Sequence, residues 1–118
     1  MSKVSMTIFG EPCSKANSRR LVKSKTGSPM FIKSKKALSY VKSFHNQCKK
    51  CDPLITGDVS ITIKIYYRSR RPDLDESLIL DVMQGFVYKN DRQVKEKHVY
   101  WGGVDKENPR AEISVRHL

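Results

Sequence analysis

The stretch GDVSITIKIYYRS, residues 57–69, constrains the fold more than any other part of the sequence. Its aliphatic residues occupy every second position, at Val59, Ile61, Ile63 and Ile65. Alternate side chains of a β-strand point to opposite faces, so this pattern predicts a long strand with one buried face. Such a strand needs a sheet around it and a layer packed against it.

Shorter patterns indicate the remaining strands. Apolar alternation predicts strands at 3–9 and 110–117, and apolar or aromatic residues indicate others at 30–32 and 93–103. We expect the last two strands to form a hairpin, because GGVDKENP between them is rich in residues that favour turns.

Two helices are predicted. Ser34 is an acceptable N-cap for the first, which ends by Pro53 because proline cannot continue a helix. Its buried stripe is expected at helical spacing, at Leu38, Val41, Phe44 and Cys48. The second is a short helix in ESLILDVMQG, stopped by Gly85. We therefore expect one α+β domain over residues 1–118, a mixed or antiparallel sheet of about four strands with helices packed against it.

The chain is strongly basic, with 23 Lys and Arg against 12 Asp and Glu and a net charge of +11 over 118 residues. Nucleic acid is the commonest partner of such a surface. A basic loop at 10–29 is expected to bind it through Lys15, Arg19 and Arg20. No segment resembles a membrane span or a signal peptide, and three cysteines fit a reducing compartment, so we expect a cytoplasmic protein without a membrane partner.

Acidic residues gather in one place, RRPDLDESLILD at 70–81. Asp73 and Asp75 are two residues apart at the end of the long strand, so in an extended chain both side chains point to one face. Two carboxylates so close repel each other, and a divalent cation such as Mg²⁺ removes that cost. The alternative is that this segment caps the following helix, with Glu76 favouring its first turn.

A third carboxylate, Asp91, stands in the turn-like segment YKNDRQV. A loop returning to the sheet could bring Asp91 beside the first two aspartates, and the neighbouring bases would hold a phosphate backbone, namely Arg68, Arg70, Arg71 and Arg92. The alternative for this segment is a simple Asx turn. Asp81 is expected to point away from the site, since six helical residues turn the chain by about 600°.

These segments resemble the signature of the RusA-type Holliday-junction resolvases, an endonuclease family common in phages and prophages. The family has an R-x-D-L-D-N stretch that runs into a helix and then an aromatic-x-D-D-x-Q-[VI] motif, which read here as RRPDLDES and YKNDRQV. The opening TIFGEPCSKANSRR is similar to the strand and G-x-P-x-x-K loop at the family's start. The similarity covers nearly the whole chain.

The resemblance implies that Asp73, Asp75 and Asp91 bind Mg²⁺, for which Mn²⁺ can substitute, and carry catalysis. It also implies a homodimer that cuts branched DNA inside a bacterial host, encoded by a phage or prophage. Two-fold symmetry suits this substrate, because symmetric cutting of two strands of a four-way junction requires two equivalent active sites.

The sequence departs from the family pattern at three places. Glu76 stands where the family has asparagine, and Asn90 stands where it often has the first aspartate of its pair. The helical lysine that the family places after its D-x-D motif is missing. Lys89 or Arg71 is a candidate to supply that charge.

A second candidate metal set consists of residue types that bind zinc, namely Cys13, His45, Cys48 and Cys51. The last three follow helical spacing, which does not converge well on one ion. We therefore expect Cys48 to pack in the core and Cys51 to lie at the helix end.

Aromatic residues near the acidic cluster are candidates for contacts with bases. One of Tyr66 and Tyr67 must face the core, because neighbours on a strand point oppositely, and the other could stack on an exposed base. Trp101 is expected in the core.

The sequence thus predicts a Mg²⁺-dependent, structure-selective DNA endonuclease. Two alternatives remain open. One is a non-catalytic nucleic-acid-binding protein on the same fold, which the missing lysine favours, and the other is a nuclease directed at RNA.

Overall fold

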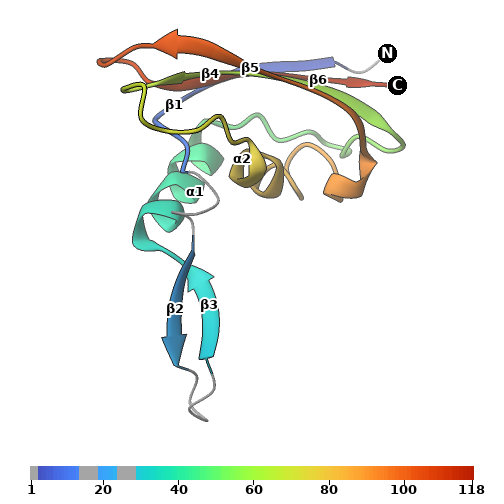
Figure 1. Ribbon diagram of the computed structural model, residues 1–118. Helices are drawn as coiled ribbons and strands as arrows, with labels where there is room; N and C mark the ends of the chain where they lie inside the picture. The colour runs from blue at the N-terminus through green and yellow to red at the C-terminus, as the bar shows by residue number, and fades with distance from the viewer. Residues whose placement is uncertain (1–2, 14–18, 24–28) are drawn as a thin grey trace.

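The computed structural model describes residues 3–13, 19–23 and 29–118, with the backbone alone for 19–23 and 29–33. Secondary-structure elements follow one another along the chain (Figure 1): β1 Lys3–Phe9, β2 Arg19–Lys23, β3 Pro29–Lys33, α1 Lys35–Gln47, β4 Val59–Tyr67, α2 Ser77–Val82, the 3-10 turn η1 Asp91–Gln93, β5 Val94–Val104 and β6 Arg110–His117. Every strand expected from the sequence is present.

Four strands form one mixed sheet in the order β1-β6-β4-β5. β6 pairs antiparallel with β1 and with β4, whereas β5 runs parallel to β4. Figure 1 shows both helices on the same side of this sheet. The predicted class, a single α+β domain with helices against a mixed sheet, is confirmed.

The predicted hairpin between the last two strands is wrong. β5 and β6 are not neighbours, because β6 lies between β1 and β4. The burial explains this placement: β6 buries Ala111, Ile113 and Val115, whereas no residue of β5 is fully buried. A strand with exposed lysines suits the edge of a sheet, where charge discourages pairing with other chains. The chain reaches β5 from β4 through α2 and η1, which is why the pair is parallel.

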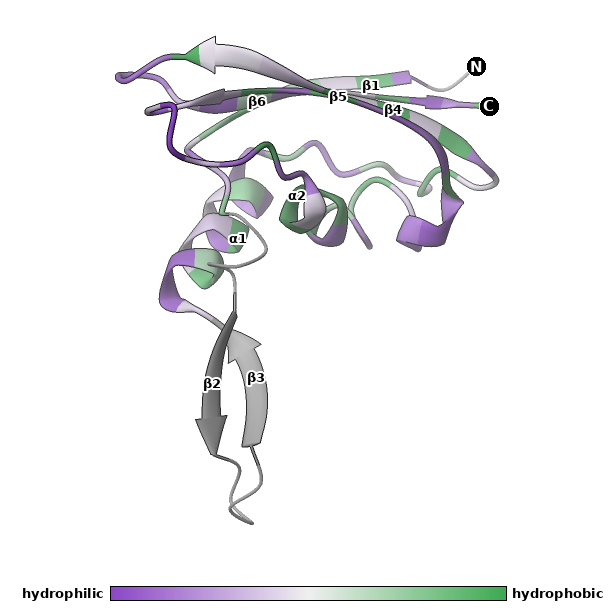
Figure 2. Cartoon of the chain, viewed as in Figure 1, coloured by the Kyte–Doolittle hydropathy of each residue, from purple (hydrophilic) through white to green (hydrophobic). Residues whose placement is uncertain are grey.

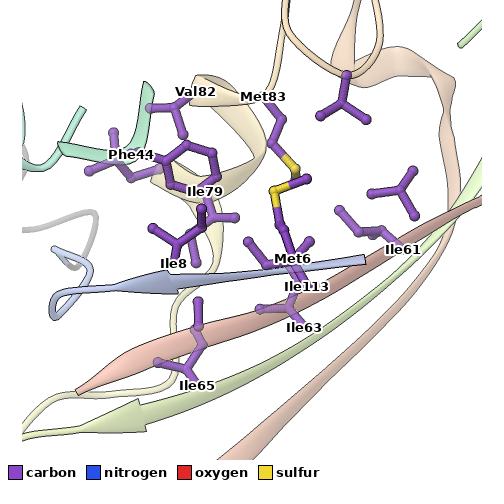
Figure 3. Packing of buried hydrophobic residues seen from close by; sticks show 14 of the residues in the cluster. Met6, Ile8, Phe44, Ile61, Ile63, Ile65, Ile79, Val82, Met83 and Ile113 are labelled. Atoms are coloured by element: carbon purple, nitrogen blue, oxygen red, sulfur yellow. The ribbon is translucent and has the colours of Figure 1, made fainter. Parts of the chain in front are cut away.

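The core lies between the sheet and the helices (Figure 3). The alternating residues of β4 are fully buried there, as expected, and β1 adds Met6 and Ile8. The helices contribute Phe44, Ile79 and Val82 to the same cluster. Burial of these side chains is the main force that holds the helices on the sheet.

Helix α1 begins as predicted, with the Ser34 hydroxyl oxygen accepting a hydrogen bond from the Ala37 backbone N–H at 3.1 Å. The predicted buried stripe is shifted. Ala37, Tyr40 and Phe44 are buried, whereas Leu38 is 52% exposed. Several apolar stripes fit one helical period in this segment, and only packing against the sheet selects between them.

The basic segment 10–29 is not a loop throughout. Arg19–Lys23 forms β2, which pairs antiparallel with β3 in a separate two-stranded sheet. Figure 1 shows this ribbon extending away from the helices and the main sheet. In the described part of the chain, no helix is long and apolar enough to cross a membrane.

Candidate active site

The acidic segment connects β4 to α2 and lies at the surface. In Figure 2 most of this connection is coloured as hydrophilic. Arg68, Arg70 and Arg71 are exposed on it, and Asp73 and Asp75 follow, the first exposed and the second half-buried. Three positive side chains are therefore followed, within a few residues, by two negative ones at the end of a central strand.

Tyr67, the last residue of β4, anchors this segment from the core side. Its side chain is 2% exposed, so the prediction that one of the two tyrosines faces the core is confirmed. Its hydroxyl donates a hydrogen bond to the Asp73 carbonyl at 3.1 Å and accepts one from the Asp75 backbone N–H at 3.2 Å. A core side chain thus holds the backbone of both aspartates.

The pKa of Tyr67 reflects the charged groups around its hydroxyl. Burial raises the pKa of Tyr67, and the negative charges of Asp75, Glu11 and Glu76 raise it further, opposed by the hydrogen bond from the Asp75 N–H. Tyr67 therefore lies in the negative field of three carboxylates.

Asp75 also has a structural role. Its Oδ1 accepts a hydrogen bond from the Ser77 backbone N–H at 2.9 Å, at the start of α2. Asp75 therefore accepts the N–H bond that the helix-capping alternative predicts, whereas the N-cap residue itself, Glu76, makes no side-chain cap hydrogen bond. This bond orients the carboxylate, and a carboxylate with two oxygens can accept a cap bond and still serve as a ligand.

Glu76 makes an ion pair that the sequence did not reveal. Its Oε2 lies 3.4 Å from Nζ of Lys97, which is on β5. The parallel pairing of β4 and β5 places Lys97 opposite Ile61, whose side chain points to the helices. An expected hairpin of β5 with β6 gave no reason to look for a β5 lysine here.

Glu11 is a second residue that sequence reasoning missed. It follows β1, and its Oε2 accepts a hydrogen bond from the Arg68 backbone N–H at 2.7 Å. This bond ties the chain after β1 to the first residue of the arginine-rich segment. The acid in the G-E-P sequence was the available signal, but it stands in a stretch dominated by lysine and arginine.

Asp91 lies in η1, which is held by a capping box between Asn90 and Gln93. The Asp91 N–H donates a hydrogen bond to Oε1 of Gln84 at 3.3 Å. Burial raises the pKa of Tyr88, and the charges of Asp91 and Asp81 add to that shift. The charge of Asp91 therefore acts on the Tyr88 hydroxyl, whereas the charges of Asp75 and Glu76 act on that of Tyr67.

One tyrosine anchors the backbone of both Asp73 and Asp75, whereas Asp91 lies on a different element, η1. In the described residues, no three His, Cys, Asp or Glu side chains are grouped so that they could hold one ion. Asp81 is exposed, as expected, and so is Lys89. Lys15 lies outside the described residues, and Arg19 and Arg20 are placed on β2 by their backbone alone.

The zinc-type residues have other contacts. The His45 ring stacks on Phe86 with centroids 4.0 Å apart, and its Nε2 is 3.0 Å from the Val82 carbonyl oxygen. Cys48 packs against the core as expected, and burial raises its pKa to about 11. Burial also raises the pKa of Cys51, so both thiols favour the protonated form.

A small basic α+β domain with carboxylates and arginines gathered after a central strand has the residue types of a nuclease. The comparison with known families agrees, since the sequence matches the family Endodeoxyribonuclease RusA over residues 10–116. The chain belongs to this family. A search among curated proteins returned no match to the sequence.

Proposed function

We propose that the protein is a Mg²⁺-dependent endonuclease that resolves four-way DNA junctions or related branched DNA. The family supplies the class of reaction, cleavage of DNA. The observation that carries the proposal for this chain is the Tyr67 contact, which holds Asp73 and Asp75 directly after three exposed arginines. Arginines bind phosphates, and the carboxylates stand beside them.

Asp73, Asp75 and Asp91 would hold the cation, with Mn²⁺ able to replace Mg²⁺. The donors are all carboxylate oxygens, which hard cations prefer, and Mg²⁺ commonly uses only one or two carboxylates beside waters and phosphates. Asp73 and Asp75 on one anchored segment fit this requirement. Asp91 is not grouped with them in the described residues, so η1 would have to bring it closer when the ion binds. Such an ion lowers the pKa of a bound water and offsets negative charge on a phosphate.

The chain's own part is to bring the phosphate and orient the acids. Arg68, Arg70 and Arg71 would bind the DNA backbone beside the aspartates, and Lys15, Arg19 and Arg20 would extend that contact along the basic segment. Asp75 is oriented by the Ser77 N–H and by Tyr67. A bound phosphodiester would therefore meet fixed carboxylates.

Lys97 is a better candidate than Lys89 or Arg71 for the positive charge expected near the D-x-D motif. It contacts Glu76, the residue next to Asp75, at 3.4 Å. We assign Lys97 a positioning role, in which it holds Glu76 and adds a cation to a group of acids. The proposal also includes a homodimer with one site per subunit and a phage- or prophage-encoded protein of the bacterial cytoplasm.

A cleavage panel tests the proposal. Labelled four-way junction, flap and linear duplex are incubated with Mg²⁺, Mn²⁺ or EDTA, and the expected result is metal-dependent cutting of the branched DNA. Asp75→Asn should abolish cutting while junction binding persists. Asp58→Asn is the matched control, because Asp58 is exposed just before the opposite end of β4.

The alternatives predict other patterns in the same panel. A non-catalytic binding protein would retard the junction in a gel and leave it intact in every buffer. A nuclease directed at RNA would cut a structured RNA of matched sequence and spare the DNA. Cutting by Asp75→Asn at the wild-type rate in Mg²⁺ would overturn the assignment of the site.

A further inference from the structure

Trp101 was expected in the core, and the structure contradicts this. It is 40% exposed on β5, which is an edge strand of the main sheet. Large aromatic side chains usually bury their apolar surface. An exposed tryptophan beside the candidate active site therefore indicates a role in binding.

The ring of Trp101 rests on the tyrosine that anchors the acidic segment. The Trp101 and Tyr67 rings stack with centroids 5.0 Å apart and an angle of 25° between their planes. The Tyr67 hydroxyl in turn contacts the backbone of Asp73 and Asp75. One buried side chain therefore links the exposed indole to both aspartates.

A local irregularity of β5 sets the position of Trp101. Trp101 pairs with Ile65, but the next residue of β4, Tyr66, pairs with Gly103, so Gly102 is an extra residue in β5. A Cβ atom on Gly102 would lie 2.8 Å from Cζ of Tyr66, so any larger residue here would force a neighbouring side chain to shift. Bulges of this kind change the direction of neighbouring side chains and are common beside active sites.

We propose that Trp101 is a stacking site for an exposed nucleobase of branched DNA. An indole held on one side by Tyr67 is a rigid, sequence-tolerant platform for the π-face of a base. The exposed arginines of the β4–α2 connection would hold the phosphates next to that base, which directs the adjoining phosphodiester towards Asp73 and Asp75. A base at a branch point has lost one of its stacking neighbours, so one of its faces is exposed. The Trp101 ring can stack on such a face. The inference rests on the DNA-binding part of the proposed function.

Intrinsic fluorescence provides a direct test, because the chain has one tryptophan. The wild-type protein is titrated in EDTA, which prevents cutting, with a four-way junction, a linear duplex of matched length or inorganic polyphosphate. The expected result is saturable quenching of Trp101 emission by the junction and much weaker quenching by the other two ligands. Equal quenching by polyphosphate, or unchanged emission at a junction concentration that saturates a gel shift, would overturn the inference.

Variants provide the second arm of the test. Trp101→Ala should weaken junction binding in EDTA by about 5- to 150-fold, the range for loss of one stacked base, and Trp101→Phe should recover part of it. Tyr100→Ala is the matched control, expected to bind within about twofold of wild type. Tyr100 is 50% exposed on the same strand but points to the opposite face of the sheet, opposite Lys64.

The two proposals fail separately. Quenching by the junction without metal-dependent cutting supports the stacking site and contradicts the proposed enzyme. Cutting by a protein whose Trp101 emission does not respond to the junction supports the enzyme and contradicts the stacking site. A thermal melt of Trp101→Ala checks that its fold is intact, and the wild-type titration decides the question if it is not.

Discussion

The Tyr67 hydroxyl accepts a hydrogen bond from the Asp75 backbone N–H at 3.2 Å, and this contact connects the hydrophobic core to the candidate active site. The same hydroxyl donates to the Asp73 carbonyl at 3.1 Å. Tyr67 is itself buried as the last residue of β4. The position of the two carboxylates is therefore set by the packing of the sheet rather than by the connection alone.

Tyr67→Phe should reduce cleavage and leave junction binding in EDTA nearly unchanged. The variant keeps the ring and its packing but removes both hydrogen bonds to the acidic segment. A shift of the carboxylates by about 1 Å is enough to cost on the order of 100-fold in rate. The two lost bonds should also lower the free energy of unfolding by about 1–2 kcal/mol. Wild-type cleavage by Tyr67→Phe would show that the aspartates need no such support.

Tyr40→Phe is the matched control for that variant and a prediction of its own. Tyr40 is also buried, but in the described residues its hydroxyl has no hydrogen-bond partner. Removing an unpaired buried hydroxyl is expected to leave the free energy of unfolding unchanged or raise it by about 1 kcal/mol. Chemical denaturation measures this, and a loss of more than about 1 kcal/mol would reveal a partner for this hydroxyl.

The sequence predicted the strands well because their period depends only on which face is buried. Val59–Tyr67 and Arg110–His117 have the expected alternation, and it fixes their faces in the structure. Alternation does not say which strand pairs with which, so the neighbours of β6 were predicted incorrectly. The order in a sheet depends on how several strands share one core, and no local pattern records that.

The site was predictable where it is local and not where it depends on pairing. Asp73 and Asp75 stand out because they are close in sequence and follow a strand. Lys97 reaches Glu76 only because β5 runs parallel to β4. Trp101 was assigned to the core because tryptophan usually packs there, and its exposure follows from the edge position of β5.

Gln93 is predicted to be essential for the turn that carries Asp91. Its Oε1 accepts hydrogen bonds from the backbone N–H groups of Lys89 and Asn90, each at 3.0 Å. Its Nε2 donates to the carbonyls of Ile55 and Gly57 at 2.8 and 2.9 Å. Gln93→Ala should therefore lower the free energy of unfolding by about 2–4 kcal/mol and also reduce cleavage.

Gln47→Ala controls for the loss of stability. Gln47 likewise connects separate segments, since its side chain bonds both the N–H and the carbonyl of Phe9, and it lies on α1, in a part of the fold that carries none of the aspartates. Denaturant unfolding and junction cleavage are measured for both variants below their melting temperatures. Equal cleavage by the two would contradict a special role of the Asp91 turn.

Lys97→Met should reduce cleavage by about 10- to 100-fold, as is typical when a residue that orients a functional carboxylate is lost. The free energy of unfolding should change by less than about 1 kcal/mol, because the Lys97–Glu76 pair is partly exposed. The reduction is expected in kcat rather than KM, and Lys97→Arg should restore part of it. Lys95→Met, on the same strand, controls for the general loss of positive charge. A double variant with Glu76→Gln should be no worse than either single change if the two residues act as one unit.

Asp105 should make stability depend on pH in the acid range. The Asn108 backbone N–H and then the Arg110 guanidinium, which donate to it at 3.0 and 2.8 Å, hold the pKa of Asp105 below its ordinary value. The Asp105 N–H also donates to the Tyr67 carbonyl at 2.8 Å, so this loop is attached to the end of β4.

The sign of the effect follows from the depressed pKa. A carboxylate whose pKa is lower in the folded state stabilises that state above its unfolded pKa of about 3.9, and the stabilisation is lost as pH falls through the folded pKa. Asp105→Asn should thus be less stable than wild type at neutral pH, and the difference should shrink steadily below about pH 4. Urea unfolding across this range measures it, with Glu107→Gln in the same loop as a control for the loss of one negative charge. A difference that stays constant through the acid range would mean that Asp105 acts through its shape and hydrogen bonds rather than through its charge.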